Sequence, residues 1–311
     1  MQVTGDPLFD ATLDRLAPEG RVGLAVSGGP DSLALLLLAA RARPNDIEVA
    51  TVDHGLRPES AAEAAKVADI CDRLGVPHFT LRAEVADGAS RQARARDARY
   101  DVLALWMMAR RLRWLATAHH ADDQAETLLM RLARGSGLSG LSAIRERLPI
   151  SPDLTIIRPL LDWSKAELRA VVEQAGIDPV DDPSNRDPAH DRTRFRSLLA
   201  AHDWIEPARL ARSAAALAEA EEALDFALRP LEQERLWVTA SGVSLHAFDL
   251  PAELQRRLLA RAFRRLGPGR PRGPELDRAL ECLRRGGRCT LAGALLTGGE
   301  VWKLSPEPPR A

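Results

Sequence analysis

Short apolar runs alternate with longer segments of helical periodicity over residues 1–205. Each run has the length of a strand, and each segment that follows spaces its apolar residues three and four apart, as a helix does. Strands that alternate with helices in this way predict an α/β fold with a doubly wound parallel sheet, Rossmann-like in its layers. The predicted strands are 21–27, 47–53, 78–82 and 114–118, and the predicted helices are 31–43, 59–74, 90–113 and 121–134.

The pattern changes after residue 205. An alanine-rich helical segment, 208–228, is followed by short strand-like and helical segments without regular alternation. We therefore predict two domains, 1–205 with the sheet and 206–311 with a helical linker and a smaller α+β fold. In the second domain the predicted strands are 236–239, 243–246, 290–296 and 300–304, and the predicted helices are 254–266 and 274–284.

A loop of small residues joins the first predicted strand to the first predicted helix. Glycines let a backbone approach a ligand closely, and a helix N-terminus offers unpaired N–H groups and a positive dipole end to an anion. The loop lacks the Gly-Lys-Ser/Thr of a Walker motif and the Gly-x-Gly-x-x-Gly pattern. A tight turn is the alternative, but the two serines and the aspartate favour a nucleotide site. The loop consists of Ser27, Gly28, Gly29, Pro30, Asp31 and Ser32.

Polar residues also follow two other predicted strands. Asp53 and His54 come at the end of the second strand, where they are candidates to hold a ribose or an adenine edge, although a solvated turn at Gly55 explains them equally well. Asp123 and Glu126 lie on one face of the helix predicted at 121–134. Two acids at this spacing make a negative pocket that suits a cationic substrate or Mg²⁺, whereas capping of the helix N-terminus is the simpler alternative.

Arginines at alternate positions follow a Pro/Asp/Asn-rich loop predicted at 178–192. Arg192, Arg194 and Arg196 would spread around a helix or share one face of an extended segment, and the sequence leaves both open. Arginine is suited to bidentate contacts with phosphate.

These motifs occur in the order found in a known family. The loop 27–32 resembles the pyrophosphate-binding loop of the PP-loop, or N-type ATP pyrophosphatase, superfamily. Together with 53–57, 119–127, 134–137, 158–161 and 182–185, it resembles the tRNA(Ile)-lysidine synthases. Arg192 and Arg196 match the family's basic motif, whereas Thr193 stands where the family usually has asparagine, which puts an amide-specific hydrogen bond there in doubt.

The resemblance implies an AMP-forming ligase. The family uses ATP to adenylate the wobble cytidine of the isoleucine tRNA with a CAU anticodon, and then joins free lysine to C2 of that base. It implies ATP binding by the loop 27–32 with Asp53 and His54, and Mg²⁺ at Asp31. The catalytic candidates are Asp31, Asp123, Glu126, Arg192 and Arg196. The oligomeric state stays open, a homodimer included.

The distribution of charge and the length of the apolar runs are consistent with this resemblance. The formal net charge is −1, but 251–290 holds eleven arginines against four acids, and 206–235 holds four against seven. The first segment predicts contact with tRNA phosphates, with a solvated arginine surface as the alternative. The chain has no apolar run near the roughly 20 residues that a membrane span needs, and we expect a cytoplasmic protein.

Two other classes of function are alternatives, a different PP-loop enzyme and a non-catalytic module. A PP-loop tRNA thiolase needs a reactive cysteine pair or an iron–sulfur site, whereas Cys71, Cys282 and Cys289 form no Cys-x-x-Cys motif. An amidotransferase-type synthetase would need a glutaminase region, for which the sequence has no spare length. A non-catalytic nucleotide-sensing or RNA-binding module is the remaining alternative, and the intact loop and acid pair argue against it.

Overall fold

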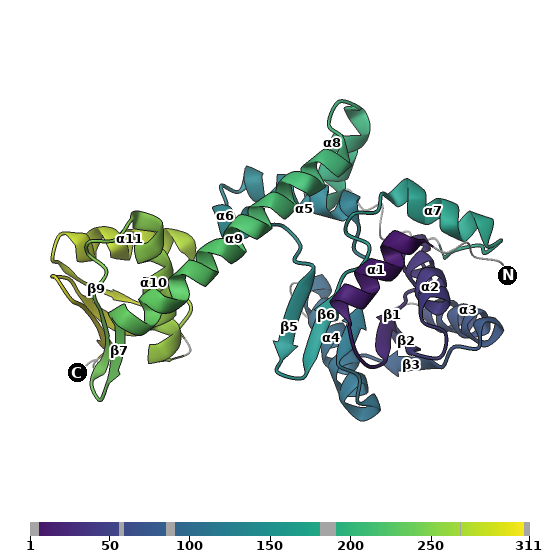
Figure 1. Ribbon diagram of the computed structural model, residues 1–311, viewed down its shortest axis with the longest axis horizontal. Helices are drawn as coiled ribbons and strands as arrows, with labels where there is room; N and C mark the ends of the chain where they lie inside the picture. Colours follow the sequence, from purple (N-terminus) through teal and green to yellow (C-terminus); the bar gives the residue numbers. More distant parts are fainter. Residues whose placement is uncertain (1–5, 56–58, 85–90, 181–190, 268, 308–311) are drawn as a thin grey trace. The chain divides into compact units, whose positions relative to one another are not determined.

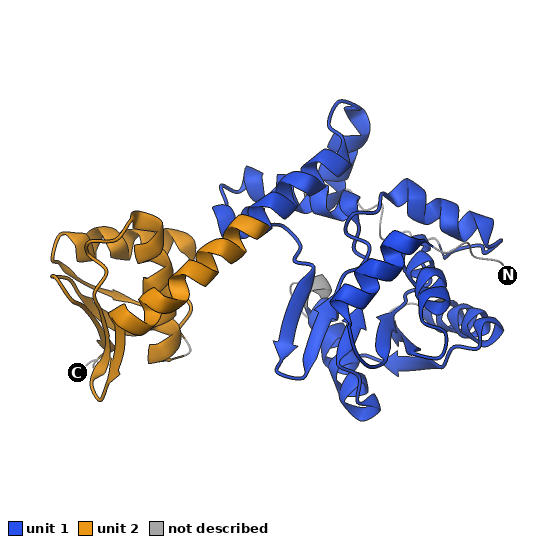
Figure 2. Cartoon of the chain, viewed as in Figure 1, with its two compact units in different colours: residues 1–218 blue, residues 219–311 orange. Residues whose placement is uncertain are grey.

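The computed structural model describes residues 6–55, 59–84, 91–180, 191–267 and 269–307. The chain divides into two compact units, Met1–Ala218 and Glu219–Ala311 (Figure 2). The predicted domain boundary, between residues 205 and 206, lies just before a long helix, α9 (Pro207–Arg235). The division between the two units instead falls inside that helix, between Ala218 and Glu219. None of the described helices is both long enough and apolar enough to span a bilayer.

Unit 1 is built around a six-stranded sheet with strand order β3-β2-β1-β4-β6-β5 (Figure 1). Its strands are β1 (Val22–Ala25), β2 (Ile47–Asp53), β3 (His78–Arg82), β4 (Trp114–Ala116), β5 (Arg147–Ser151) and β6 (Leu154–Ile157). Its helices before α9 are α1 (Pro7–Leu16), α2 (Pro30–Ala42), α3 (Glu59–Leu74), α4 (Arg91–Arg110), α5 (Ala121–Ala133), α6 (Leu138–Leu141), α7 (Lys165–Gln174) and α8 (Asp191–Ala201).

The predicted α/β fold is confirmed, with one antiparallel edge. β1 pairs in parallel with β2 and β4, and β3 and β6 extend the sheet in parallel on the two sides. β5 and β6 run antiparallel. This hairpin was not predicted from the sequence. Only Pro152 and Asp153 separate its strands, too few for the crossover that parallel strands require.

Helices cover both faces of this sheet. On one face, α1, α2, α3 and α7 bury a large apolar core that includes the unbroken run Leu33–Ala39 of α2. On the other face, Leu103, Trp106 and Met107 of α4 pack against strand residues such as Leu115 and Ile156. Because both faces are covered, β1 and β4 at the centre of the sheet are apolar throughout, as expected for buried parallel strands, whereas β2 also carries the buried Glu48 and Thr51. The polar residues after the strands therefore mark the sheet's carboxyl edge.

Unit 2 is a five-stranded antiparallel sheet with two helices. The strand order is β7-β8-β11-β10-β9. Its elements after α9 are β7 (Leu236–Thr239), β8 (Gly242–Leu245), α10 (Ala252–Leu266), α11 (Gly273–Arg284), β9 (Arg288–Leu291), β10 (Ala294–Thr297) and β11 (Trp302–Pro306). Trp302, Phe263 and Leu283 lie in its core, which also includes Leu228 of α9. This agrees with the predicted smaller α+β fold.

Candidate active site

Three of the predicted motifs converge on one cavity of about 520 Å³ at the carboxyl edge of the parallel strands. The loop after β1, the turn after β2 and the segment after β4 all reach it because parallel strands end at the same edge. The predicted site residues that line the cavity are Ser27, Gly29, Pro30, Asp31, Ser32, His54, Asp123 and Arg192. Gly28, Asp53, Glu126 and Arg196 are not among the lining residues.

The loop after β1 is held in shape by its own serines. The Ser32 hydroxyl donates to the Gly29 carbonyl at 2.9 Å and accepts from the Ser27 backbone N–H at 3.1 Å. Gly28 has φ +87°, a conformation that favours glycine, and Gly29 caps α2. The loop therefore presents the N-terminus of α2 to the cavity, and Ser32 is buried within it.

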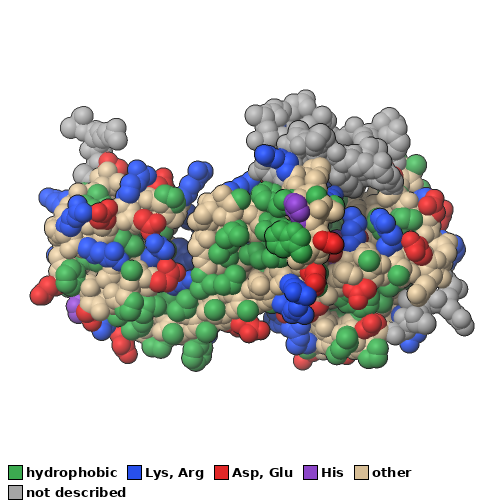
Figure 3. All heavy atoms as spheres, turned by 90° about the horizontal axis from the view of Figure 1, so that it is seen from above, with side chains coloured by type: hydrophobic (Ala, Val, Ile, Leu, Met, Phe, Trp, Pro, Cys, Tyr) green, Lys and Arg blue, Asp and Glu red, His purple; other side chains and the backbone are tan. Residues whose placement is uncertain are grey.

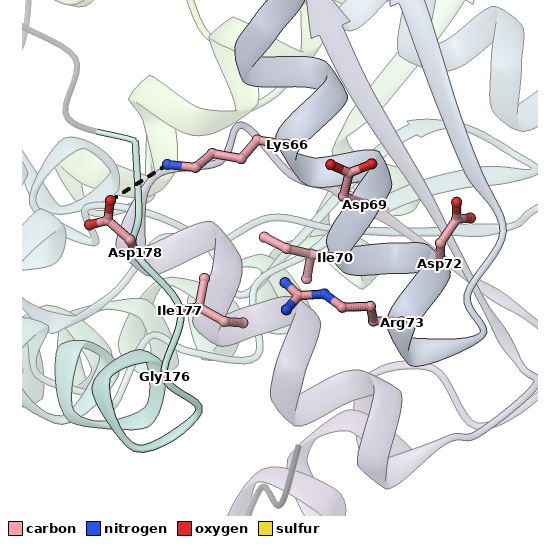
Figure 4. A pocket seen from close by; sticks show the side chains of 8 residues that line it. All are labelled: Lys66, Asp69, Ile70, Asp72, Arg73, Gly176, Ile177 and Asp178. Atoms are coloured by element: carbon pink, nitrogen blue, oxygen red, sulfur yellow. Dashed lines mark ion pairs between the residues drawn. The ribbon is translucent and has the colours of Figure 1, made fainter.

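A neighbouring segment packs against this loop from behind. The Val180 N–H donates to the Gly28 carbonyl at 2.9 Å, and a Cβ added at Gly28 would lie 3.1 Å from Val180 Cγ2. Two residues earlier, Asp178 pairs with Lys66 of α3 at 3.7 Å, at the rim of a second hollow (Figure 4). That hollow is lined by α3 and by 176–178, and it shares no residue with the cavity at the strand ends. We assign it to the packing behind the loop.

Asp31 stands at the start of α2 with one oxygen unsatisfied. Its Oδ1 is buried and has no hydrogen-bond partner, and its Oδ2 lies 3.5 Å from His120 Nε2. A buried carboxylate oxygen without a partner is costly unless a ligand or an ion satisfies it. The donor set, one carboxylate at the N-terminus of α2 beside the loop 27–32, would suit Mg²⁺ held jointly with the phosphate oxygens of a nucleotide. The described residues contain no group of three or more His, Cys, Asp or Glu side chains arranged to hold a metal ion by themselves.

The two histidines after β4 differ in charge because their surroundings differ. Burial lowers the pKa of His120, but the carboxylates of Asp122, Asp31 and Asp123 outweigh it and raise the pKa to about 10. Burial lowers the pKa of His119 to about 4, and the nearby guanidinium groups of Arg158 and Arg192 act in the same direction. His120 is therefore a cation and His119 is neutral at pH 7.

The neutral His119 is fixed by two donors. Its Nδ1 lies 3.0 Å from the Thr117 hydroxyl and 3.3 Å from Arg158 Nε. Arg158 belongs to one of the motifs that the sequence analysis singled out, and it is buried here. With Nδ1 accepting, His119 carries its proton on Nε2.

The turn after β2 separates its two candidate residues. Asp53 accepts from the Ser60 hydroxyl at 2.6 Å and the Gly55 N–H at 2.8 Å, and these hydrogen bonds lower its pKa. Its carboxylate thus closes the turn, as the simpler interpretation of this motif expected. His54 lines the cavity, and burial lowers its pKa. Its Nδ1 is buried without a hydrogen-bond partner. Arg57, which the sequence analysis included in this motif, lies outside the described residues.

The acid pair of α5 is joined to the arginines of α8. Glu126 is 3% exposed and accepts from Arg192 Nε and Arg196 Nε, each at 2.8 Å. Asp123 accepts from Arg192 Nη2 at 3.1 Å and also lines the cavity. α8 is a helix, which settles the choice that the sequence left open, and it places Arg192 and Arg196 on the face toward α5. The two acids therefore do not form an empty negative pocket, because Glu126 is neutralised by two guanidinium groups.

Part of the cavity wall was not predicted from the sequence. Arg96, Arg99 and Tyr100 of α4 line it, and the Arg96 guanidinium lies over the Tyr100 ring at 5.2 Å. Four arginines against one acid over 91–99, at the start of a predicted helix, were a signal that would have found them. The predicted motif at 182–185 lies outside the described residues.

Comparison with known proteins gives the family. Residues 7–202 match the PP-loop domain family. The tRNA(Ile)-lysidine synthase of Novosphingobium aromaticivorans is 51% identical over 310 residues, covering 96% of this chain and 93% of that protein. That of Zymomonas mobilis is 44% identical over 296 residues, covering 94% and 90%.

A solved structure shows the same fold at low identity. The U34-tRNA thiolase NcsA from Methanococcus maripaludis, with its 4Fe-4S cluster, is 15% identical, has a TM-score of 0.57, and covers 69% of this chain and 78% of its own. The likeness concerns the fold alone. At 44–51% identity over nearly the whole length of the relatives, the chain belongs to the tRNA(Ile)-lysidine synthase family, and its first unit carries the PP-loop domain.

Proposed function

We propose that this chain joins lysine to C2 of the wobble cytidine in the isoleucine tRNA with a CAU anticodon, and that ATP drives the reaction. The C2 oxygen attacks the α-phosphorus of ATP and pyrophosphate leaves. The lysine ε-amine then attacks C2, and AMP leaves with the former C2 oxygen. The observation that carries the proposal is one cavity that holds both a phosphate-binding loop and the carboxylate of Asp123.

The loop 27–32 and the N-terminus of α2 would bind the phosphates of ATP. Backbone N–H groups and a helix dipole favour the negative charge that grows as pyrophosphate departs. Mg²⁺ would be held by Asp31 with the phosphates, where it would supply positive charge to the leaving group. The unpartnered Oδ1 of Asp31 supports this assignment.

Asp123 is the carboxylate that we assign to the lysine side chain. Asp123 lines the cavity and pairs with one arginine, Arg192, whereas Glu126 pairs with two arginines and does not line the cavity. An ε-ammonium has a pKa of about 10.4, so it must lose a proton before it attacks. Asp123 would hold the ammonium and accept that proton. We assign Glu126 a positioning role, because it fixes Arg192, which lines the same cavity.

Cysteine placement argues against the thiolase alternative. Burial raises the pKa of Cys71 in α3 to about 12, which suppresses its thiolate. Cys282 and Cys289 belong to unit 2. No cysteine lines the cavity.

The test is to incubate the full chain with ATP, labelled lysine and total bacterial tRNA, and to identify the tRNA that gains label. We expect label in the isoleucine tRNA with a CAU anticodon, with one AMP formed for each lysine added. A transcript with UAU in the anticodon is the matched control, because it lacks the reacting base. Labelling of the UAU transcript, or AMP formation without lysine transfer, would contradict the proposal.

A further inference from the structure

Two of the three cysteines lie on facing elements of unit 2. Cys282 is in the last turn of α11 and Cys289 is the second residue of β9, and α11 packs against β9. Only the six residues 283–288 separate the two cysteines along the chain. Both side chains are half-buried, so neither is sealed from solvent.

The register of the sheet fixes the side on which Cys289 lies. Cys289 pairs with Leu296 of β10, and residues that pair across antiparallel strands share one face of the sheet. Leu296 is buried in the core that α10 and α11 close. Arg288 and Thr290, the neighbours of Cys289, alternate to the opposite face and are exposed. The Cys289 side chain therefore points toward the helices.

The turn after α11 holds Cys282 on the other side of this contact. The Gly287 N–H donates to the Cys282 carbonyl at 2.9 Å, and Gly286 has φ +71°, so the chain reverses directly into β9. A Cβ added at Gly287 would lie 2.9 Å from Cys282 Sγ, closer than real Cβ contacts allow. The Cys282 sulfur thus lies against Gly287, two residues before Cys289.

The two thiols interact with each other. Burial, a hydrogen bond to Cys282 and the charge of Cys282 together raise the pKa of the Cys289 thiol to about 11. Cys289 therefore keeps its proton at neutral pH and can donate it to the Cys282 sulfur. A pair of sulfurs in such contact meets the first requirement of a disulfide, that the two side chains point toward each other.

Cations flank the pair. Arg284 and Arg288 are exposed, and each lies within two residues of one of the cysteines. Figure 3 shows Lys and Arg side chains, interspersed with acids, over the surface of unit 2 on the left. Cations beside a thiol favour its thiolate, which is the nucleophilic form. Because Cys289 keeps its proton, we assign the first attack on an oxidant to Cys282.

We propose that Cys282 and Cys289 are a peroxide-reactive pair that closes to a reversible disulfide between α11 and β9. The Cys282 thiolate attacks one oxygen of hydrogen peroxide, the O–O bond breaks, and Cys282 becomes a sulfenic acid while the other oxygen leaves as water. The Cys289 sulfur then attacks the sulfenic sulfur. The S–O bond breaks, the S–S bond forms, and the hydroxide that leaves takes up the Cys289 proton as a second water.

The disulfide protects both sulfurs, because a thiol can restore them, whereas a cysteine that proceeds to sulfinic or sulfonic acid is lost. The inference is independent of the proposed function, since neither cysteine lines the cavity at the strand ends.

The test treats the full chain, reduced beforehand, with hydrogen peroxide, blocks the remaining thiols with N-ethylmaleimide and analyses tryptic peptides by mass spectrometry without reduction. Trypsin cuts after Arg284, Arg285 and Arg288, so the two cysteines fall in separate peptides, 279–284 and 289–303. We expect these two peptides to be joined by a disulfide, and dithiothreitol should separate them again.

Cys289→Ser removes the second sulfur of the pair. In this variant Cys282 should be trapped by dimedone as the sulfenic acid or proceed to sulfinic acid, which dithiothreitol does not reverse. Cys71→Ala is the control. Cys71 is fully buried in α3 and burial raises its pKa to about 12, so its loss should not change the yield of joined peptides.

Three results would overturn the proposal. One is recovery of separate, alkylated peptides from the wild type at a peroxide concentration that oxidises Cys282 in Cys289→Ser. Another is Cys282 joined to Cys71 or to a second molecule instead of Cys289. The third is the absence of any oxidation of Cys282 in both proteins.

Discussion

Arg192 joins two carboxylates of one helix: its Nη2 lies 3.1 Å from Asp123 Oδ1, and its Nε lies 2.8 Å from Glu126 Oε2. Glu126 also holds Arg196, so the buried carboxylate fastens α8 to α5 at two points. Removal of a buried charge partner costs more than the pair contributes, since it leaves the other charges uncompensated. The alignment of Arg192 and Asp123 on the cavity wall therefore depends on Glu126.

Glu126→Gln should reduce kcat/KM for lysine transfer by roughly 100-fold, the order of loss expected when groups of a site are misplaced by about 1 Å. Steady-state kinetics with lysine, ATP and tRNA varied in turn would measure it. Glu173→Gln, the same change at an exposed position of α7, is the control and should have no effect. A Glu126→Gln enzyme with wild-type kinetics would show that α8 is held by other contacts.

Asp123→Asn tests the assignment of the lysine site. The amide keeps the shape of the side chain and cannot hold an ammonium by charge or accept its proton. We expect lysine transfer to be abolished while thermal unfolding changes little. Accumulation of adenylated tRNA, measured with ATP labelled at the α-phosphate, would show that the first step survives. Near-normal lysine transfer would remove Asp123 from the mechanism.

Gly28→Ala should weaken ATP binding and lower stability. The residue has φ +87°, and the new Cβ would meet Val180 Cγ2 at 3.1 Å and Val67 Cγ2 at 3.3 Å. The left-handed conformation alone costs about 1–2 kcal/mol for a residue with a Cβ. Gly75→Ala is the control, because Gly75 has φ +69° and nothing within 4 Å of an added Cβ. If the KM for ATP rises in Gly28→Ala and not in Gly75→Ala, the effect comes from crowding of the loop by Val180 and Val67 and not from backbone strain.

The sequence predicted the features that depend on local pattern. The alternation of strands and helices, the small-residue loop before α2 and the position of Asp123 in the first turn of a helix could all be derived from spacing along the chain. Pairing between distant segments could not, because it depends on which helix packs against which. Glu126 was thus a candidate because of its spacing from Asp123. Its ion pairs with Arg192 and Arg196 form because α8 packs against α5, which the sequence does not reveal.

Charge counting along the chain has the same limit. The excess of arginine over 251–290 predicted a phosphate-binding surface, whereas the helices show arginines such as Arg257 and Arg261 paired with acids of α9. Net charge along the chain says nothing of three-dimensional pairing.

His119 should make stability depend on pH on the acid side. Its pKa is about 4 in the folded chain and about 6.5 when unfolded, so between these values the unfolded chain binds more protons. The stability that depends on a neutral His119 is therefore fully present above pH 6.5. It is lost as pH falls toward 4, and the free energy of unfolding drops by up to about 1.4 kcal/mol per pH unit. The free energy of unfolding of the wild type and of His119→Gln would be measured in urea between pH 7.5 and 4.5. As pH falls, the wild type should lose more stability than the variant. An equal loss of stability with falling pH in both proteins would contradict this prediction.

Removal of one partner of the ion pair between Glu221 and Arg257 should destabilise unit 2 strongly, whereas replacement of both partners by apolar residues should destabilise it little. Both side chains are largely buried, at 7% and 11% exposed. Arg257→Met removes the guanidinium that pairs with the buried carboxylate of Glu221, and loss of one partner of a buried ion pair destabilises a protein by about 3–5 kcal/mol. Glu221→Leu combined with Arg257→Met removes both charges, and we expect it to recover most of that loss. Hydrogen exchange at the core residues Leu258 and Phe263 would report it, because both are buried in unit 2. If the double variant is no more protected than Arg257→Met, the loss comes from the contacts of Arg257 with Glu253 and Asp225 rather than from its ion pair with Glu221.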